Sequence, residues 1–188
     1  MSLFHALAKV FRELFPMLAL ANSMNNNQNE YLIWKTQAFE LRAEEKPLVD
    51  RNDGGHIAIY PKKRIPDRQC LTPKQAVEFM RLTMVAGEAM TTAMRNNGVD
   101  IGRINYQDNG NWSVFTPAGP YFHLHIYGRA VSAKIQKYGQ SLNFPHREEY
   151  PEFYKYNEPL SAKDIDAIRT QIDLLIGSEK YADANWGV

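Results

Sequence analysis

Cysteine and long apolar stretches are both scarce in this chain of 188 residues. It has one cysteine, and no run of 18 or more apolar residues occurs in it. A single cysteine cannot form a disulfide within the chain, which favours a reducing compartment, the cytoplasm. The lack of a long apolar run argues against a membrane-spanning helix.

An excess of either charge is also absent, because the chain has 22 basic side chains and 21 acidic ones. The protein therefore lacks the basic field of a dedicated nucleic-acid-binding protein. The glycine-rich phosphate loops Gly-x-x-x-x-Gly-Lys and Gly-x-Gly-x-x-Gly are missing too. What is present is an ordinary globular composition, with 44% apolar and 23% charged residues, which suffices for one buried core.

The N-terminal segment, residues 1–21, is predicted to form an amphipathic helix. Its apolar residues keep the i, i+3, i+4, i+7 spacing of such a helix; they are Phe4, Leu7, Ala8, Phe11, Leu14, Phe15 and Leu18. The end of the segment, Ala19-Leu20-Ala21, resembles a signal-peptidase site, but Glu13 and Pro16 interrupt the apolar region that a signal peptide needs. Residues 22–30 are polar and predict a linker, which leaves residues 31–188 as the main domain with a C-terminal extension.

The main domain is predicted to be of the α+β class. Strand patterns occur at residues 31–34, 38–41, 56–60, 101–107, 111–115 and 121–129, with a hairpin turn at 108–110. A long helix is predicted from Thr72 to about Asn97, because Thr72 and Gln75 match a capping box and Pro73 suits the first helical position. A second helix is predicted from Ser161 to Ile176.

Two histidines lie in the strand pattern of residues 121–129. The strand period of two puts His123, His125 and Tyr127 on one face and apolar residues on the other. Two imidazoles at this spacing occur on plain exposed strands, in metal sites and in catalytic sites. A metal site would use His56, His123 and His125 with water as the fourth ligand, but no nearby acidic or cysteine residue has metal-ligand spacing.

The order of motifs along the chain narrows these alternatives. Gly54-Gly-His-Ile-Ala-Ile-Tyr-Pro-Lys-Lys63 precedes the capped helix, and Gly102-Arg-Ile-Asn-Tyr-Gln107 precedes the His-x-His strand. Over residues 31–130 this arrangement resembles the histidine triad family, with the variant motif His-x-His-x-Tyr. The resemblance implies an antiparallel sheet with one long central helix and a C-terminal helix, a homodimer, and a nucleotide substrate handled without a cofactor or a metal.

The resemblance also implies a role for each residue of the motif. His125 takes the place of the nucleophile that attacks the α-phosphorus and forms a covalent nucleotidyl-histidine. His123 would hold and polarise the site, and His56 would approach the phosphate from the neighbouring strand. Tyr127 stands where the family has a third histidine; its hydroxyl can donate to a phosphate oxygen but carries no positive charge at neutral pH.

Three functions follow as expectations from this resemblance. The first is hydrolysis of a nucleotide phosphoanhydride or phosphoester, of the diadenosine-polyphosphate or nucleoside-phosphoramidate type. The second is transfer of the nucleotidyl group to phosphate or a sugar phosphate, because related branches with an uncharged glutamine at the third position are transferases. The third is a nucleotide-binding protein with little turnover.

Phosphate contacts are expected just before the histidine strand and at its end. Asn105 is the favoured position by resemblance, and Asn111, Ser113 and Arg129 are further candidates. The base is expected among apolar side chains of the first strands. Leu32, Trp34, Phe39 and Leu41 are candidates for that wall, although they suit a core equally well.

Overall fold

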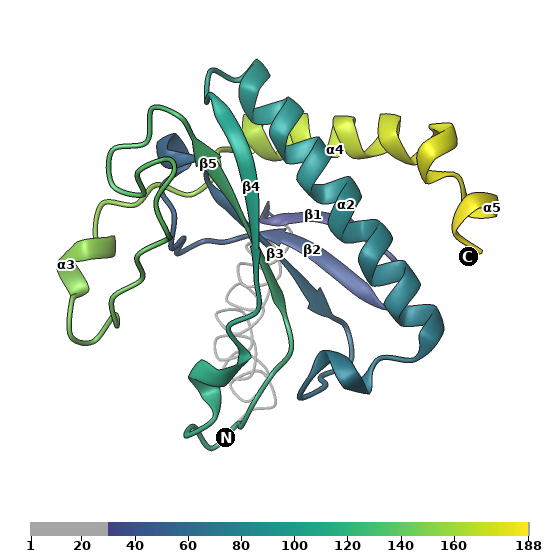
Figure 1. Ribbon diagram of the computed structural model, residues 1–188, viewed down its shortest axis with the longest axis horizontal. Helices are drawn as coiled ribbons and strands as arrows, with labels where there is room; N and C mark the ends of the chain where they lie inside the picture. Colours follow the sequence, from purple (N-terminus) through teal and green to yellow (C-terminus); the bar gives the residue numbers. More distant parts are fainter. Residues whose placement is uncertain (1–29, 188) are drawn as a thin grey trace, which may run out of the picture. The chain divides into compact units, whose positions relative to one another are not determined.

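The computed structural model describes residues 30–187, and the predicted N-terminal helix and nearly all of the predicted linker lie outside this range. A five-stranded sheet forms the centre of the described part (Figure 1). Its strands lie in the order β1-β2-β3-β5-β4, and the β2–β3, β3–β5 and β5–β4 pairs are antiparallel. The strands are β1 (Leu32–Lys35), β2 (Phe39–Ala43), β3 (His56–Pro61), β4 (Ile101–Gln107) and β5 (Leu124–Ala130).

One face of the sheet is covered by a long helix, α2 (Pro73–Asn96), and a second helix, α4 (Ala162–Ile176), packs against α2 (Figure 1). The α+β class predicted from the sequence, with a long central helix and a C-terminal helix, is confirmed. No helix within residues 30–187 is long and apolar enough to cross a membrane. The shorter helical segments are η1 (Arg51–Asp53), η2 (Arg68–Cys70), η3 (Gly110–Ser113), α3 (Pro151–Tyr154), η4 (Glu179–Tyr181) and α5 (Asp183–Trp186).

The ends of α2 are set by the residues that predicted them. Thr72 Oγ1 accepts a hydrogen bond from the Gln75 backbone N–H at 3.3 Å, and Gln75 Oε1 accepts from the Thr72 N–H at 3.0 Å. This capping box satisfies backbone N–H groups that have no partner within the helix. At the other end Gly98 adopts a φ of 86°, a left-handed conformation that glycine takes without strain.

Alternation along the strands gives the sheet an apolar face and a polar face. On the apolar face the Phe79 ring of α2 lies 5.5 Å from the Phe39 ring of β2 and 5.2 Å from the Phe122 ring. Phe39 and Leu41 are fully buried there, so these two base-wall candidates belong to the core. The same face carries the buried pairs Ile57–Ile126 and Ile59–Leu124 of β3 and β5.

Residues 111–115 do not form the predicted strand, because the chain enters η3 at Gly110 instead. Asp108 Oδ1 accepts from the Gly110 N–H at 3.1 Å, and Ser113 Oγ donates to the Gly110 carbonyl at 3.1 Å. Such local side-chain bonds compete with pairing between strands, and Asp, Asn, Gly and Ser favour them. Among the described residues β4 therefore pairs with β5 alone and forms an edge of the sheet.

Candidate active site

The polar face of the sheet brings the three candidate histidines into one cluster. Backbone pairing places His56 opposite Tyr127 and Ala58 opposite His125, so the side chains of each pair lie on the same face of the sheet. His56 Nε2 lies 2.8 Å from His125 Nδ1. The ring centroid of His123 lies 4.5 Å from that of His125.

A backbone N–H determines the protonation of His56 and, through it, that of His125. The Leu48 N–H donates to His56 Nδ1 at 3.1 Å, so this nitrogen presents a lone pair. A neutral His56 then carries its proton on Nε2 and donates it to His125 Nδ1. A neutral His125 must therefore carry its own proton on Nε2. Its remaining nitrogen is a hydrogen-bond donor and has no nucleophilic lone pair.

Burial keeps both of these histidines neutral. The exposed fraction is 2% for His56 and 7% for His125. Burial lowers the pKa of His56 well below its ordinary value, and the nearby His125, Arg147 and His123 lower it further. Burial, and after it the neighbouring His123, lowers the pKa of His125 to about 3. The neutral forms that the hydrogen-bond chain requires are thus the forms present at neutral pH.

His123 is held in the opposite tautomer. Its Nδ1 lies 2.9 Å from the carbonyl oxygen of Tyr121. A carbonyl oxygen can only accept, so Nδ1 carries the proton and a neutral His123 has its lone pair on Nε2. The side chain is half-buried and stacks with the rings of Tyr60 and Tyr121, at centroid distances of 5.3 and 5.4 Å. His123 therefore has the nucleophilic nitrogen that His125 lacks.

Tyr127 does not have the position expected for a phosphate contact. It is fully buried, and its ring lies 5.0 Å from that of Phe144, which belongs to the segment that follows β5. Its hydroxyl accepts a hydrogen bond from Asn109 Nδ2 at 3.4 Å. Because this segment covers the ring, Tyr127 packs against the histidine cluster and does not face a substrate.

The guanidinium of Arg129 is used for contacts within the protein, which argues against the phosphate contact predicted for it. Only 4% of the residue is exposed. Its guanidinium donates to the carbonyl oxygens of Gln136, Lys137 and Gln140 at 3.3, 2.9 and 2.9 Å. Arg129 therefore orders the loop after β5.

The other phosphate candidates divide between β4 and η3. Asn105 is half-buried and its backbone lies opposite Tyr127, on the polar face. Ser113 uses its hydroxyl for the turn of η3, and the side chain of Asn111 lies outside the described part of the structure. Gln107 lies opposite His125 and was missed by the sequence reasoning, although pairing the predicted strands in antiparallel register would have placed it there.

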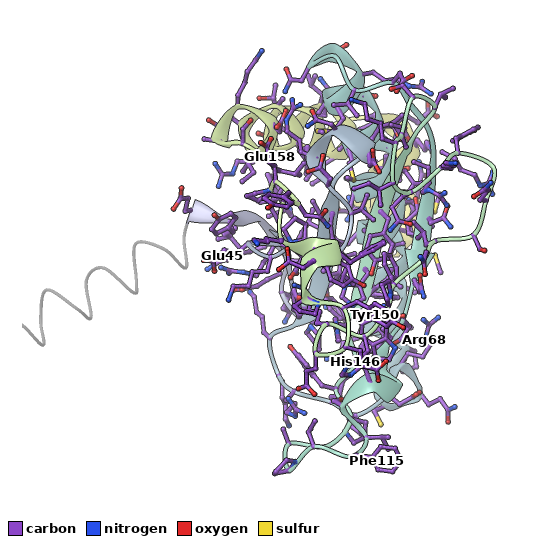
Figure 2. All side chains as sticks on the ribbon, turned by 90° about the vertical axis from the view of Figure 1, so that its left-hand side faces the viewer. Glu45, Arg68, Phe115, His146, Tyr150 and Glu158 are labelled. Carbon is purple, nitrogen blue, oxygen red and sulfur yellow. The ribbon has the colours of Figure 1, made fainter. Side chains whose placement is uncertain are left out.

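A hollow of about 590 Å³ lies next to Tyr127, and none of His56, His123 and His125 lines it. Its lining includes Phe144, whose ring contacts Tyr127, and two exposed aromatic residues, Trp112 and Phe115. In Figure 2 Phe115 projects from the lower end of the picture, with His146 above it. The remaining lining residues are His146, Arg147 and Glu148. Cavities of this size hold small ligands, and aromatic rings beside a guanidinium suit a flat anionic one.

Within residues 30–187 no three His, Cys, Asp or Glu side chains are grouped closely enough to hold a metal ion. His56 Nε2 and His125 Nδ1 already share a hydrogen bond. The cluster therefore consists of a hydrogen-bonded pair, His56 and His125, with the ring of His123 packed against His125.

The sequence matches no family model and no curated protein. Among solved structures, a uridylyltransferase is 11% identical, with a TM-score of 0.51, over 90% of this chain and 50% of that one. A zinc-bound histidine triad family protein from Mycobacterium smegmatis is 18% identical, with a TM-score of 0.49, over 79% and 88% of the two chains. A hypothetical histidine triad nucleotide-binding protein from Sulfolobus tokodaii is 15% identical, with a TM-score of 0.48, over 78% and 85%. Likeness at these identities concerns the fold alone: the chain shares an α+β fold with the uridylyltransferase.

Proposed function

We propose that the protein processes nucleotides through a covalent nucleotidyl-histidine, with His123 as the nucleophile and His125 as a hydrogen-bond donor. The observation that carries the proposal is the pair of opposite tautomers on one strand. The Tyr121 carbonyl leaves His123 with a lone pair on Nε2, whereas His56 leaves His125 with a proton on Nε2. A phosphoryl group placed before the two rings meets a nucleophile and a donor.

The reaction would proceed in two displacements at phosphorus. In the first, the His123 Nε2 lone pair attacks the α-phosphorus and a P–N bond forms. With a phosphoanhydride the P–O bond to the leaving group breaks with its electron pair on oxygen; with a phosphoramidate the P–N bond to the leaving group breaks and the leaving nitrogen takes a proton from solvent. His123 keeps its Nδ1 proton, which is hydrogen-bonded to the Tyr121 carbonyl, so the nucleotidyl-imidazole is a cation. In the second, an acceptor oxygen attacks the same phosphorus, any proton on that oxygen passes to solvent, and the P–N bond to His123 breaks with its electron pair on Nε2, which releases neutral His123. The Nε2–H of His125 donates to the phosphoryl oxygens, on which negative charge develops.

This proposal moves the motif by two residues relative to the sequence prediction, which made His125 the nucleophile and Tyr127 the third member. The hydrogen bonds favour Tyr121, His123 and His125 as the three positions. Tyr127 then falls outside the motif, which agrees with its complete burial. The roles predicted for His123 and His125 are exchanged.

The substrate class that we propose is a nucleoside phosphoanhydride or phosphoramidate. The hollow next to Tyr127 supports it, because the rings of Trp112, Phe115 and Phe144 can stack on a base. Arg147 also lines the hollow; its guanidinium donates to the Lys46 carbonyl and lies over the Tyr154 ring, so it would contribute positive charge to the site. Hydrolysis and transfer differ only in the acceptor oxygen. The fold shared with a uridylyltransferase favours keeping a phosphate or sugar phosphate among the acceptors to be tested.

A homodimer is part of this proposal. The outer edge of β4 pairs with no other strand among the described residues, and open edges are commonly covered in native proteins. Tyr106 on β4 lies against Gly87 of α2, and Met84 and Met80 come one and two turns before Gly87 on the same face of that helix. Tyr106, Met80 and Met84 are 47%, 51% and 38% exposed. A second copy that joins there would cover both the edge and these side chains.

The proposal is tested by trapping the intermediate. Purified protein is incubated with diadenosine polyphosphate, adenosine 5′-phosphoramidate and a nucleotide sugar, and acid-labile nucleotidyl-protein is followed together with nucleotide release. We expect His123→Ala to lose the adduct and to reduce release by about 10³-fold or more. We expect His125→Gln to form the same adduct about 10²- to 10³-fold more slowly, because one donor to the phosphoryl oxygens is lost.

Tyr156→Ala is the control, since this aromatic residue is 77% exposed and lines neither the histidine cluster nor the hollow. An adduct that survives in His123→Ala and disappears in His125→Gln would restore the roles predicted from the sequence. Nucleotide binding without adduct or release in the wild-type protein would instead identify a binding protein.

A further inference from the structure

We propose that Glu44, held by Tyr60, supplies the negative charge that stabilises the cationic nucleotidyl form of His123. This inference rests on the proposed function, because the cation exists only if His123 is the nucleophile. Glu44 follows β2 and Tyr60 belongs to β3, and both lie outside the histidine motif. Neither residue touches the reacting atoms, so both are positioning residues.

The first step is the fixed place of Glu44. It follows β2 directly, and its backbone N–H donates to the His56 carbonyl at 3.2 Å. Its carboxylate accepts a hydrogen bond from the Tyr60 hydroxyl at 2.5 Å. A hydrogen bond of this length from a phenol to a carboxylate is a strong one, and it favours the ionised acid.

The second step is the link from Tyr60 to the nucleophile. The rings of Tyr60 and His123 are stacked, with their centroids 5.3 Å apart and their planes within 8° of each other. Tyr60 thus has two contacts at once, its ring against the imidazole and its hydroxyl on Glu44. An aromatic face also favours a cation above it, so the stack and the carboxylate act in the same direction.

The third step is the balance of charge around Glu44. The titratable and charged groups that face it are Tyr60 of β3, His123, Arg42 of β2 and Arg147. Burial raises the pKa of Glu44, while the Tyr60 hydrogen bond and a positive charge on His123 lower it. Formation of the cationic intermediate therefore favours the carboxylate, and by reciprocity the carboxylate favours the intermediate.

With a phosphoanhydride, no proton needs to move in this step. The P–N bond forms, the P–O bond breaks, and the leaving-group oxygen takes the electron pair as described above. The imidazole changes from neutral to cationic at a place from which water is partly excluded, where an unpaired charge is costly. A carboxylate that is already in position offsets that cost without any rearrangement.

The test compares three variants in the adduct assay. Glu44→Gln keeps the size of the side chain and an oxygen that can accept from Tyr60, but it removes the charge. We expect adduct formation to slow about 10- to 100-fold, as for loss of one nearby charge, with little change in KM. Glu45→Gln is the matched control, because its side chain is the next one along the chain and is exposed (Figure 2). We expect it to react at the wild-type rate.

The pH profile separates this role from a merely structural one. In the wild type, protonation of Glu44 removes the negative charge and slows adduct formation, so Glu44 should contribute to the acidic limb of the profile. In Glu44→Gln this contribution should be lost. Tyr60→Phe keeps the ring and removes the donor, which should raise the pKa of Glu44 further and move the limb to higher pH.

The outcomes distinguish the inference from the proposed function. Absence of any adduct in the wild type overturns both. A His123 adduct that forms in Glu44→Gln at the wild-type rate overturns the inference alone. A slower rate in Glu44→Gln with an unchanged pH profile also overturns it, because distortion of the site would then account for the loss.

Discussion

At the scale of single residues, the chemistry of His123 and His125 depends on what each Nδ1 atom contacts. The strand period predicts that both lie on one face, and the structure places both there. The strand period cannot predict that the two histidines have different tautomers, because it only places both side chains on the same face. The distinction comes from the Leu48 N–H and the Tyr121 carbonyl. The first belongs to a loop whose approach to β3 depends on packing elsewhere, so no local pattern predicts it.

Lowered histidine pKa values predict how stability changes with pH. His125 has a pKa of about 3 in the folded protein and about 6.5 when unfolded, so below pH 6.5 the unfolded chain binds more protons. The free energy of unfolding should therefore fall as the pH falls, by about 1.4 kcal/mol per pH unit for this histidine near pH 5. The shift of His56 has the same sign and adds to the effect. Urea unfolding between pH 7 and pH 5 measures the slope.

The variant His125→Gln isolates this contribution, and its slope should be shallower than that of the wild type. His146→Gln serves as the comparison, because it removes a histidine whose side chain is exposed. Equal slopes for the wild type and His125→Gln would contradict the assignment of His125 as a neutral buried imidazole.

At the scale of elements, the sequence predicts best where a local signal and burial agree. The capping box and the terminal glycine placed α2 correctly, and strand alternation placed β3, β4 and β5. The strand prediction failed at residues 111–115, where side-chain hydrogen bonds within η3 replace strand pairing. The sequence also gives no local sign of why Gly54 and Gly128 are glycines. A Cβ on Gly128 would lie 2.2 Å from the Gly54 carbonyl oxygen, so both glycines permit a close approach of two segments far apart in sequence.

The junction of α4 with the rest of the fold depends on Asp164. This carboxylate is fully buried and accepts hydrogen bonds from Arg51 at 2.6 and 2.9 Å, from Asn97 at 2.9 Å and from the Ser161 cap. We expect Asp164→Ala to lower the free energy of unfolding by about 3 kcal/mol or more, because it removes the Asp164 half of the capping box and leaves the Arg51 charge without its partner. Urea unfolding at pH 7 measures this loss.

A neighbouring acid on the same helix provides the control. Asp166 pairs with Arg169 at the surface, and Asp166→Ala should cost less than about 1 kcal/mol. A loss of similar size in the two variants would show that the buried network does not hold α4 in place.

At the scale of the whole molecule, the part of the site that escaped prediction is the part built by distant segments. Tyr127 has the strand position of a site residue, yet Phe144 covers it. Trp112 and Phe144 line the same hollow although 32 positions separate their numbers in the chain. Strand periodicity predicts on which face of the sheet a side chain lies. The loops that pack on that face determine which of its side chains remain exposed.

Assembly of two chains is the prediction that belongs to this scale. If a second copy covers β4 and the exposed methionines of α2, the wild-type protein should sediment with twice the mass of one chain at micromolar concentrations. A charge at the contact costs far more when it is buried than when it is solvated, so Met80→Glu combined with Met84→Glu should yield monomers. Leu174→Glu is the control, because Leu174 is 65% exposed on α4, away from the open strand. A monomeric wild-type protein would contradict the dimer. A dimer that Leu174→Glu disrupts and the methionine variant does not would place the interface elsewhere.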